Sequence, residues 1–350
     1  MFHELSVVTN LVLFLGGAVV ILWSGTRLER VTDTIAVRTG MGGALAGLVL
    51  LALATSLPEV ATTATAVLRG NVELAVTNLL GGTAFQVVVL VIADSAAQHG
   101  PLTGRAPSFA VLIQGVALMA MLGLAVCGLA LGEDIQLAPS VLGVSFGFNP
   151  VLLLLPLVYF AVIRLTQLGG GSPRWQTVGQ ADPDPVPASD PPAWREAVGR
   201  RLRFAFIVLA ALVAVGGWVA ASSADVIADQ TGFSSGFVGA TLLAAATSLP
   251  EISTTVAAAR DGNHELAVAN VMGSNGFDVA LLALVSLLAG GAFAVTEASV
   301  FLAGLAVVLT SVYLVGLLQR SDRAVGRLGL DSVTVAVLYL AGVGVLFGLG

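Results

Sequence analysis

Ten apolar stretches, each about 20 residues long, constrain this chain more than any other feature of its sequence. An α-helix needs about that length to cross a bilayer, and only helices and closed barrels satisfy all of their backbone hydrogen bonds inside one. We therefore predict an all-α fold, a polytopic membrane protein with ten transmembrane helices. The predicted spans are residues 5–24, 42–67, 72–96, 107–131, 139–163, 204–222, 236–259, 265–290, 295–318 and 332–349.

The composition agrees with a lipid-facing surface. Charged residues make up 10% of the 350 residues and hydrophobic ones 57%, whereas soluble domains carry about 25% charged residues. A net charge of −6 without any basic run gives a phosphate backbone nothing to bind, so nucleic acid is excluded as a partner. A single cysteine excludes both an intramolecular disulfide and a cysteine zinc cluster. The expected partner is the lipid bilayer, and nothing in the sequence requires more than a monomer.

The basic residues predict the orientation in the membrane. All 15 are arginines, and the ten-span arrangement places every one except Arg69 on the same side. By the positive-inside rule this side is cytoplasmic. Both termini are then expected on the external side of the plasma (inner) membrane. Asp94, near the cytoplasmic end of the third span, is expected to be solvated.

A stretch rich in proline and glycine, residues 166–203, divides the chain into two parts. It has almost nothing to bury, so we expect a solvated cytoplasmic linker. The first five-helix repeat is then residues 1–165 and the second is residues 204–350.

An internal repeat lies within these two parts. Gly47–Gln86 aligns with Gly239–Asp278 without a gap at an offset of 192 residues, with 22 identities in 40 positions. Both copies contain Ala-Thr-Ser-Leu-Pro-Glu followed by Gly-Asn-x-Glu-Leu-Ala-Val, and the motifs extend over residues 42–92 and 234–284. Each half has an odd number of spans, so the second copy runs in the opposite direction. An inverted repeat of this kind is typical of secondary transporters, whose binding site lies near the bilayer midplane.

The repeated motif can supply ligands for a cation. Pro58 and Pro250 lack an amide hydrogen, so the carbonyl four residues before each proline loses its helical partner. A glutamate, Glu59 or Glu251, follows each proline. An acidic side chain within a membrane span is energetically costly, so its presence there indicates a function. An oxygen-only cage of this composition suits calcium or sodium.

The helix after each motif adds polar residues along one stripe. Asn270, Ser274 and Asp278 fall at i, i+4 and i+8. With Asp278 the site could reach a formal charge of −3, which cations or protons must always compensate in a region of low dielectric. This condition favours obligatory exchange. The corresponding residues of the first copy are Asn78, Gly82 and Gln86.

Other readings are less favoured. A proline can simply kink a helix, and Glu73 and Glu265 are expected to cap helices or to be solvated at the membrane interface rather than to bind an ion. A cation channel would release ions poorly from so acidic a site. A hydrolase would need a nucleophile or zinc motif that the sequence lacks, so we do not expect an enzyme.

The paired motifs resemble the alpha repeats of the calcium/cation antiporter superfamily, specifically its sodium/calcium exchanger family. The resemblance implies exchange of one calcium ion for several sodium ions by alternating access, with the first and sixth spans sliding against a rigid core and no cofactor. It implies a calcium site formed by Glu59, Glu251 and the carbonyls of Thr55 and Thr247. It also implies sodium sites formed by Ser56, Ser248, Ser274, Asp278 and carbonyls near Ala52 and Ala244.

Two positions depart from the family pattern. Gly82 stands where the family has the serine that Ser274 retains, and Gln86 stands opposite Asp278 where an asparagine or aspartate is expected. Calcium ligation should survive both changes, and Gln86 should bring an amide further into the cage. The alternative to sodium as counter-ion is the proton, which would make the chain a calcium/proton antiporter, or another cation/proton exchanger, with the same cage.

Overall fold

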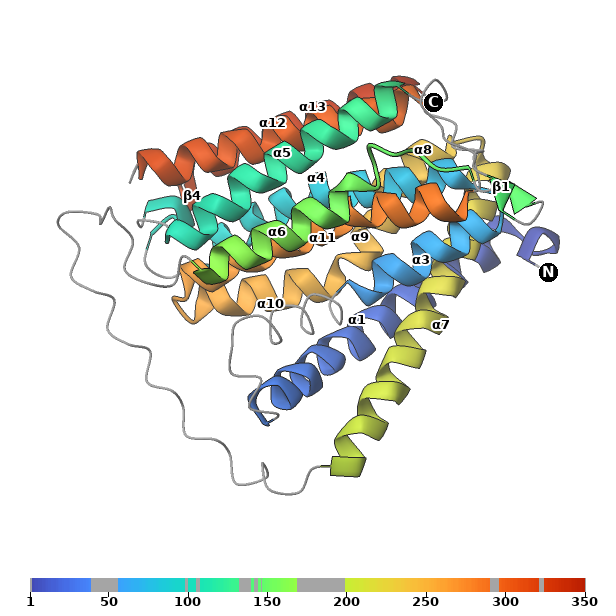
Figure 1. Ribbon diagram of the computed structural model, residues 1–350, viewed down its shortest axis with the longest axis horizontal. Coiled ribbons are helices and arrows are strands. Elements are labelled where there is room, and N and C mark those ends of the chain that lie inside the picture. Colours follow the sequence, from blue (N-terminus) through green and yellow to red (C-terminus); the bar gives the residue numbers. More distant parts are fainter. Residues whose placement is uncertain are drawn as a thin grey trace.

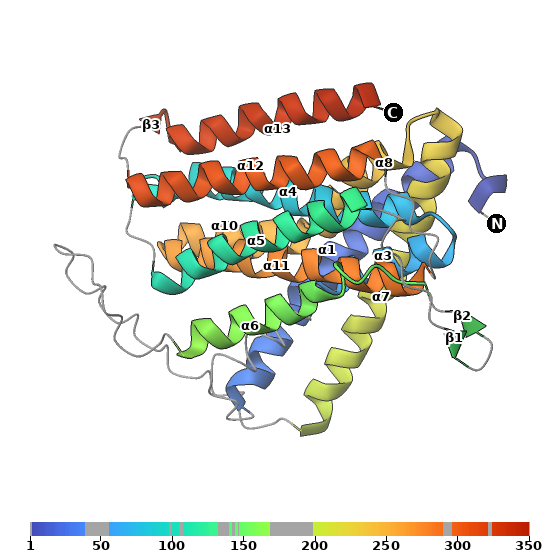
Figure 2. The ribbon, with the colours of Figure 1, turned by 45° about the horizontal axis from the view of Figure 1, so that its top comes forward.

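The computed structural model describes residues 2–38, 56–97, 100–104, 108–131, 140–141, 144–145, 147–168, 199–289, 296–320 and 324–349. Within these ranges the chain is almost entirely helical (Figures 1 and 2). The main helices are α1 (Val7–Arg38), α3 (Leu57–Leu68), α4 (Val72–Ala96), α5 (Phe109–Leu131), α6 (Leu154–Leu168), α7 (Gly199–Thr231), α10 (Leu249–Arg260), α11 (His264–Leu288), α12 (Glu297–Gln319) and α13 (Leu330–Leu349). Shorter elements are η1 (Phe2–Glu4), η2 (Leu102–Gly104), α8 (Ser235–Val238), the π-helical turn η5 (Gly239–Leu243), α9 (Ala244–Thr247), and the strand pairs β1 (Ser140–Val141) with β2 (Val144–Ser145) and β3 (Ala324–Val325) with β4 (Leu328–Gly329).

Seven of the described helices are long and apolar enough to cross a membrane: α1, α4, α5, α7, α11, α12 and α13. The bent run from α8 to α10 makes an eighth if it is counted as one span, and α6 is apolar but shorter. The predicted class, a helical protein with many membrane spans, is therefore confirmed. Part of the second predicted span, residues 42–55, lies outside the described residues, as does most of the predicted linker, residues 169–198.

The fifth predicted span, residues 139–163, is wrong in its first part. Ser140–Val141 pairs with Val144–Ser145 as antiparallel strands, and α6 begins only at Leu154. Asn149 explains the late start, because its Oδ1 accepts hydrogen bonds from the next backbone N–H groups, beginning with Val151 at 3.0 Å. This side chain closes the turn that leads into α6. Hydropathy does not report such a turn.

Helices α4 and α11 form the centre of the molecule. The most apolar segment of α4 is 83% buried and that of α11 is 72% buried, whereas α13 is only 22% buried. Figures 1 and 2 show α1 and α7 along one side of this pair and α12 and α13 along the opposite side. The outer helices therefore face lipid, and polar residues on α4 and α11 are held away from it.

The two central helices begin in the same way. Asn71 precedes α4 and accepts a hydrogen bond from the Leu74 N–H at 2.9 Å, and Asn263 precedes α11 and accepts one from Leu266 at 3.1 Å. The glycine before each asparagine has a φ near +80°, which lets the preceding helix end in a tight turn. Asparagine rather than Glu73 or Glu265 is thus the capping residue, and the glutamates lie in the first turns.

Helices α1 and α7 pack closely where a glycine of one helix faces a glycine of the other. A Cβ added to Gly17 would lie 2.9 Å from the Gly216 carbonyl oxygen, so the two backbones nearly touch. Each helix also contacts the proline motif of the other half. A Cβ at Gly25 of α1 would lie 2.7 Å from Pro250 Cγ, and a Cβ at Gly217 of α7 would lie 2.8 Å from Ala61 Cβ. We call these two contacts the crossed glycine contacts.

Asp94 is not solvated as predicted, because it is only 1% exposed. Its Oδ1 accepts a hydrogen bond from the Leu102 N–H at 2.7 Å, and its Oδ2 accepts one from the Gly329 N–H at 2.8 Å. Two backbone donors thus replace water around the carboxylate, and Asp94 joins the end of α4 to η2 and β4.

Candidate ion-binding site

The second proline motif breaks a helix in the middle of the molecule. Helices α9 and α10 meet at Ser248 with a bend of 52°, and Pro250 occupies the first turn of α10. Because Pro250 has no N–H, the Ala246 carbonyl has no helical donor. The predicted distortion therefore occurs at the predicted place.

The first motif has the same local geometry. Ser56 (φ −87°, ψ 12°) precedes α3 as Ser248 (φ −81°, ψ 5°) precedes α10, and Pro58 lies in the first turn of α3. The carbonyl oxygens of Ser56 and Ser248 each accept the N–H four residues later, at 3.1 and 3.0 Å. Ala52 and Thr55, which were predicted as ligands, lie outside the described residues.

Three acidic side chains come together between these motifs. Glu59 on α3, Glu251 on α10 and Asp278 on α11 are 3%, 0% and 0% exposed. Burial removes each carboxylate from water, and the charges of Glu251 and Asp278 both act on Glu59. The structure thus brings together the three carboxylates that the sequence singled out.

Several buried oxygens in this region have no hydrogen-bond partner among the described residues. Both Glu59 oxygens, Asp278 Oδ1 and the hydroxyls of Ser56 and Ser248 have no hydrogen-bond partner among the described residues, and all are buried. Thr247, whose side chain interacts with the Glu59 carboxylate, is buried as well. Buried polar atoms in proteins are normally paired, so a set of acceptors without donors is suited to a cation.

Carboxylates alone do not complete the site. Among the described residues, no group of three or more His, Cys, Asp or Glu side chains could hold a metal ion. Hydroxyl and carbonyl ligands are therefore needed. The Ala244 carbonyl, a predicted ligand, already accepts hydrogen bonds from the Ser248 N–H at 3.1 Å and the Thr247 hydroxyl at 3.2 Å.

Gln86 closes one side of the site. Its Nε2 donates to Asp278 Oδ2 at 3.0 Å, and its Oε1 accepts from the Ser274 hydroxyl at 2.6 Å. All three side chains are buried. The Gln86 amide thus engages two of the residues that were expected to bind sodium.

Gly82, one helical turn before Gln86, leaves space beside this network. The residue is buried, yet a Cβ added to it would meet no atom within 4 Å. The missing serine hydroxyl is therefore not replaced by another side chain.

Asn78 and Asn270 have a structural role that the sequence reasoning missed. Asn78 Nδ2 donates to the Thr62 hydroxyl at 3.2 Å, and Asn270 Nδ2 donates to the hydroxyls of Thr254 and Thr255 at 3.1 and 3.0 Å. These bonds tie α3 to α4 and α10 to α11. The repeated Thr-Thr after each Pro-Glu was the available signal.

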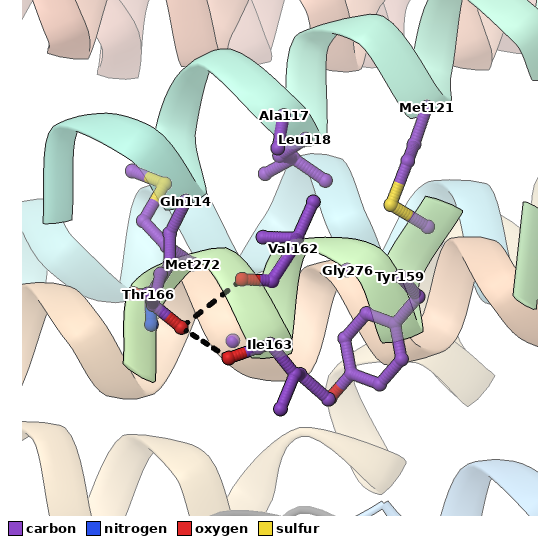
Figure 3. Close-up of a pocket in the computed structure, with 11 residues that line it drawn as sticks. Gln114, Ala117, Leu118, Met121, Tyr159, Val162, Ile163, Thr166, Met272 and Gly276 are labelled. Carbon is purple, nitrogen blue, oxygen red and sulfur yellow. Dashed lines mark hydrogen bonds between the residues drawn. The ribbon is translucent and has the colours of Figure 1, made fainter. Parts of the chain in front are cut away.

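Tyr159 of α6 was not anticipated either, because it lies outside both motifs. Its ring packs against Gly276 and meets the Phe277 ring edge-on, with centroids 5.9 Å apart and planes at 69°. It lines a cavity of about 20 Å³ between α5, α6 and α11, opposite Met121 (Figure 3). Tyr159 thereby covers the side of α11 next to Asp278.

The chain matches the family described as "Sodium/calcium exchanger protein" over residues 9–179 and 202–348. The protein CaxA of Alkalimonas amylolytica is 28% identical over 322 residues, which are 89% of this chain and 92% of that protein. The inner membrane protein YrbG of Escherichia coli (strain K12) is 28% identical over 271 residues, 77% of each protein.

Solved structures share the fold. The sodium-calcium exchanger NCX_Mj superposes with a TM-score of 0.54 at 19% identity, covering 97% of this chain and 99% of that chain. The H+/Ca2+ exchanger CAX superposes with a TM-score of 0.61 at 12% identity, covering 97% and 88%. The family match includes both proline motifs and both central helices, and so the chain belongs to the sodium/calcium exchanger protein family.

Proposed function

We propose that this protein is a secondary active antiporter that exchanges calcium for sodium across the plasma (inner) membrane. The observation that carries the proposal is the convergence of Glu59, Glu251 and Asp278 in a buried region. The salt bridges formed within the described ranges, His3 with Asp229 and Arg69 with Asp225, lie elsewhere. A divalent cation bound by both glutamates would compensate this negative charge. Transport rather than catalysis is the role of the site.

Alternating access in our proposal rests on ten transmembrane helices in two inverted repeats, residues 1–165 and 204–350. Contacts between equivalent positions support this arrangement. Gln86 with Asp278, Thr83 with Asn275, and Met119 with Ser311 are each separated by 192 residues and each hydrogen-bonded. A residue touches its own equivalent only near a twofold axis. The axis would pass between α4 and α11, beside the acids.

The arginine distribution supports the proposed orientation, with external termini and a cytoplasmic linker at residues 166–203. The protein would act as a monomer, because each half supplies ligands to the same site. No cofactor takes part, and the bound species are the transported ions.

Protons are the second candidate for the counter-ion. Gln86 favours them, because its amide engages both Asp278 and Ser274 and so occupies a place that a sodium ion would fill. Gly82 offers no hydroxyl to replace what is lost.

Uptake of radioactive calcium into proteoliposomes decides between the two. In one experiment, vesicles loaded with sodium are diluted into sodium-free medium. In the other, vesicles with an acidic interior are diluted into medium of higher pH. We expect uptake driven by the outward sodium gradient. Calcium uptake that follows only the proton gradient would show that the counter-ion is the proton and not sodium. Absence of calcium uptake under both gradients would refute calcium antiport.

A further inference from the structure

A second group of buried polar side chains lies away from the transport site, where α4 ends. It consists of Asp94 on α4, Thr103 in η2, Tyr313 on α12 and Ser332 in α13, all buried, together with the half-buried Asp331 at the start of α13, and we call it the Asp94–Asp331 cluster. Its five residues lie outside the repeated motifs, and none is needed for the site formed by Glu59 and Glu251. By the arginine distribution this end of α4 faces the cytoplasm.

The two carboxylates of the cluster flank one glycine. Asp94 Oδ2 accepts a hydrogen bond from the Gly329 N–H at 2.8 Å, and a Cβ added to Gly329 would lie 2.5 Å from Asp331 Oδ1. The Asp331 carboxylate also lies against α12, since a Cβ on Gly316 would be 2.6 Å from its Oδ2. Gly329 and Gly316 thus leave the room in which Asp331 approaches Asp94.

Three oxygens of the cluster have no partner. Tyr313 Oη, Ser332 Oγ and Asp331 Oδ2 form no hydrogen bond with the described residues, although Tyr313 is 0% exposed and Ser332 is 1% exposed. A tyrosine hydroxyl is a good donor to a carboxylate, and the charges of Asp94 and Asp331 both act on Tyr313. No such bond is formed by Tyr313 Oη or by Asp331 Oδ2, so these oxygens are left without the partner that buried polar atoms normally have.

The chemistry of the cluster indicates which kind of ion could bind there. Two carboxylates give a formal charge of −2, and the salt bridges of the described residues involve neither of them. The Thr103 side chain and the backbone N–H groups at the start of α13 donate hydrogen bonds to Asp331, but none of these donors carries a full positive charge. All available ligand atoms are oxygens, which suits a hard cation and excludes thiophilic metals.

We propose that the Asp94–Asp331 cluster is a second calcium site, which binds one ion between the two carboxylates with Tyr313 and Ser332 as neutral oxygen ligands. It contains two acids, fewer than a site made of carboxylates alone would need, so the hydroxyls are part of the coordination. The bound ion would join the end of α4, the helix that carries Gln86, to α12 and α13. This site is independent of the proposed transport function.

The test is equilibrium binding of radioactive calcium to the full-length protein in detergent, in a Glu59→Gln/Glu251→Gln background that disables the transport site. We expect saturable binding of one calcium ion to remain. Asp331→Asn in this background should weaken the affinity by about tenfold or more, and Tyr313→Phe should weaken it as well. Asp229→Asn is the matched control, because that acid is exposed and pairs with His3 elsewhere; it should leave binding unchanged.

Absence of saturable calcium binding in the double-glutamine background would overturn the proposal. Binding that Asp331→Asn leaves unchanged would do the same, and so would binding that equimolar sodium abolishes. If Asp331→Asn does not yield folded protein, the calcium-induced shift in melting temperature decides. Calcium should raise the melting temperature of the double-glutamine protein, and Tyr313→Phe should reduce that rise, whereas an equal rise in both proteins would refute the site.

Discussion

Gln86 and Asp278 occupy equivalent positions of the two halves, 192 residues apart, and they hydrogen-bond to each other at 3.0 Å. The neutral amide of Gln86 thus donates a hydrogen bond to one carboxylate oxygen of Asp278, which lies near Glu59. The same amide accepts a hydrogen bond from the Ser274 hydroxyl, so Gln86 links Asp278 and Ser274 in one hydrogen-bond network.

This relationship predicts the effect of restoring oxygen ligands. In Gly82→Ser/Gln86→Asn, the new hydroxyl enters open space and the shorter amide withdraws from Asp278. We expect calcium uptake to depend more steeply on sodium concentration, because an additional sodium ion can bind. Gly273→Ser is the control, since a Cβ there also meets no atom within 4 Å but lies on the cavity side of α11. An unchanged sodium dependence would show that Gln86 does not limit sodium binding.

Glu251→Gln should reduce calcium uptake to the level of empty vesicles while leaving the protein folded. The change removes the charge of a carboxylate that is 0% exposed but nearly preserves its volume. Uptake in proteoliposomes and the elution profile in detergent are the measurements. Glu265→Gln, an exposed position in the first turn of α11, should transport normally. Uptake by Glu251→Gln at the wild-type rate would mean that the cage is misassigned.

The crossed glycine contacts predict a block of transport without loss of ligands. Valine at Gly25 or Gly217 would collide with Pro250 or Ala61, so α1 or α7 would be pushed off the proline motifs. We expect each variant to lose most calcium uptake. Gly16→Val is the control, because nothing lies within 4 Å of its Cβ position. Equal uptake by all three variants would argue against tight packing of these helices during transport.

Asp94→Ala should destabilise the fold. It removes two hydrogen bonds to backbone N–H groups and leaves the Leu102 and Gly329 donors buried, at a cost of about 3 kcal/mol. The melting temperature in detergent should fall by several degrees. The exposed Asp261→Ala is the comparison, with little change expected. Similar melting temperatures for both variants would contradict a stabilising role for Asp94.

Much of the core could be predicted from the sequence, because its signals are local. Helices α4 and α11 are long apolar segments that begin after Gly-Asn, and their limits follow from hydropathy and capping. Burial of Glu59 and Glu251 followed from the cost of an acid within an apolar span. These inferences needed no knowledge of distant contacts.

The remaining features depend on residues far apart in the chain. Asp94 is buried only because Gly329 and Leu102 donate to it, and Tyr159 lies beside Asp278 only because α6 packs on α11. The turn at Asn149 also has too few residues to alter a hydropathy average. Long-range pairing of this kind leaves no periodic pattern in the sequence.

The crossed glycine contacts also bear on how such a protein is made. Helix α1 carries Gly25, and its partner Pro250 is synthesised more than 200 residues later. The second half makes the reciprocal contact through Gly217. Each of α1 and α7 thus packs against the proline motif of the other half, and the two halves are intertwined in the way that subunits of a domain-swapped dimer are. Both contacts can therefore form only after the C-terminal half has been synthesised.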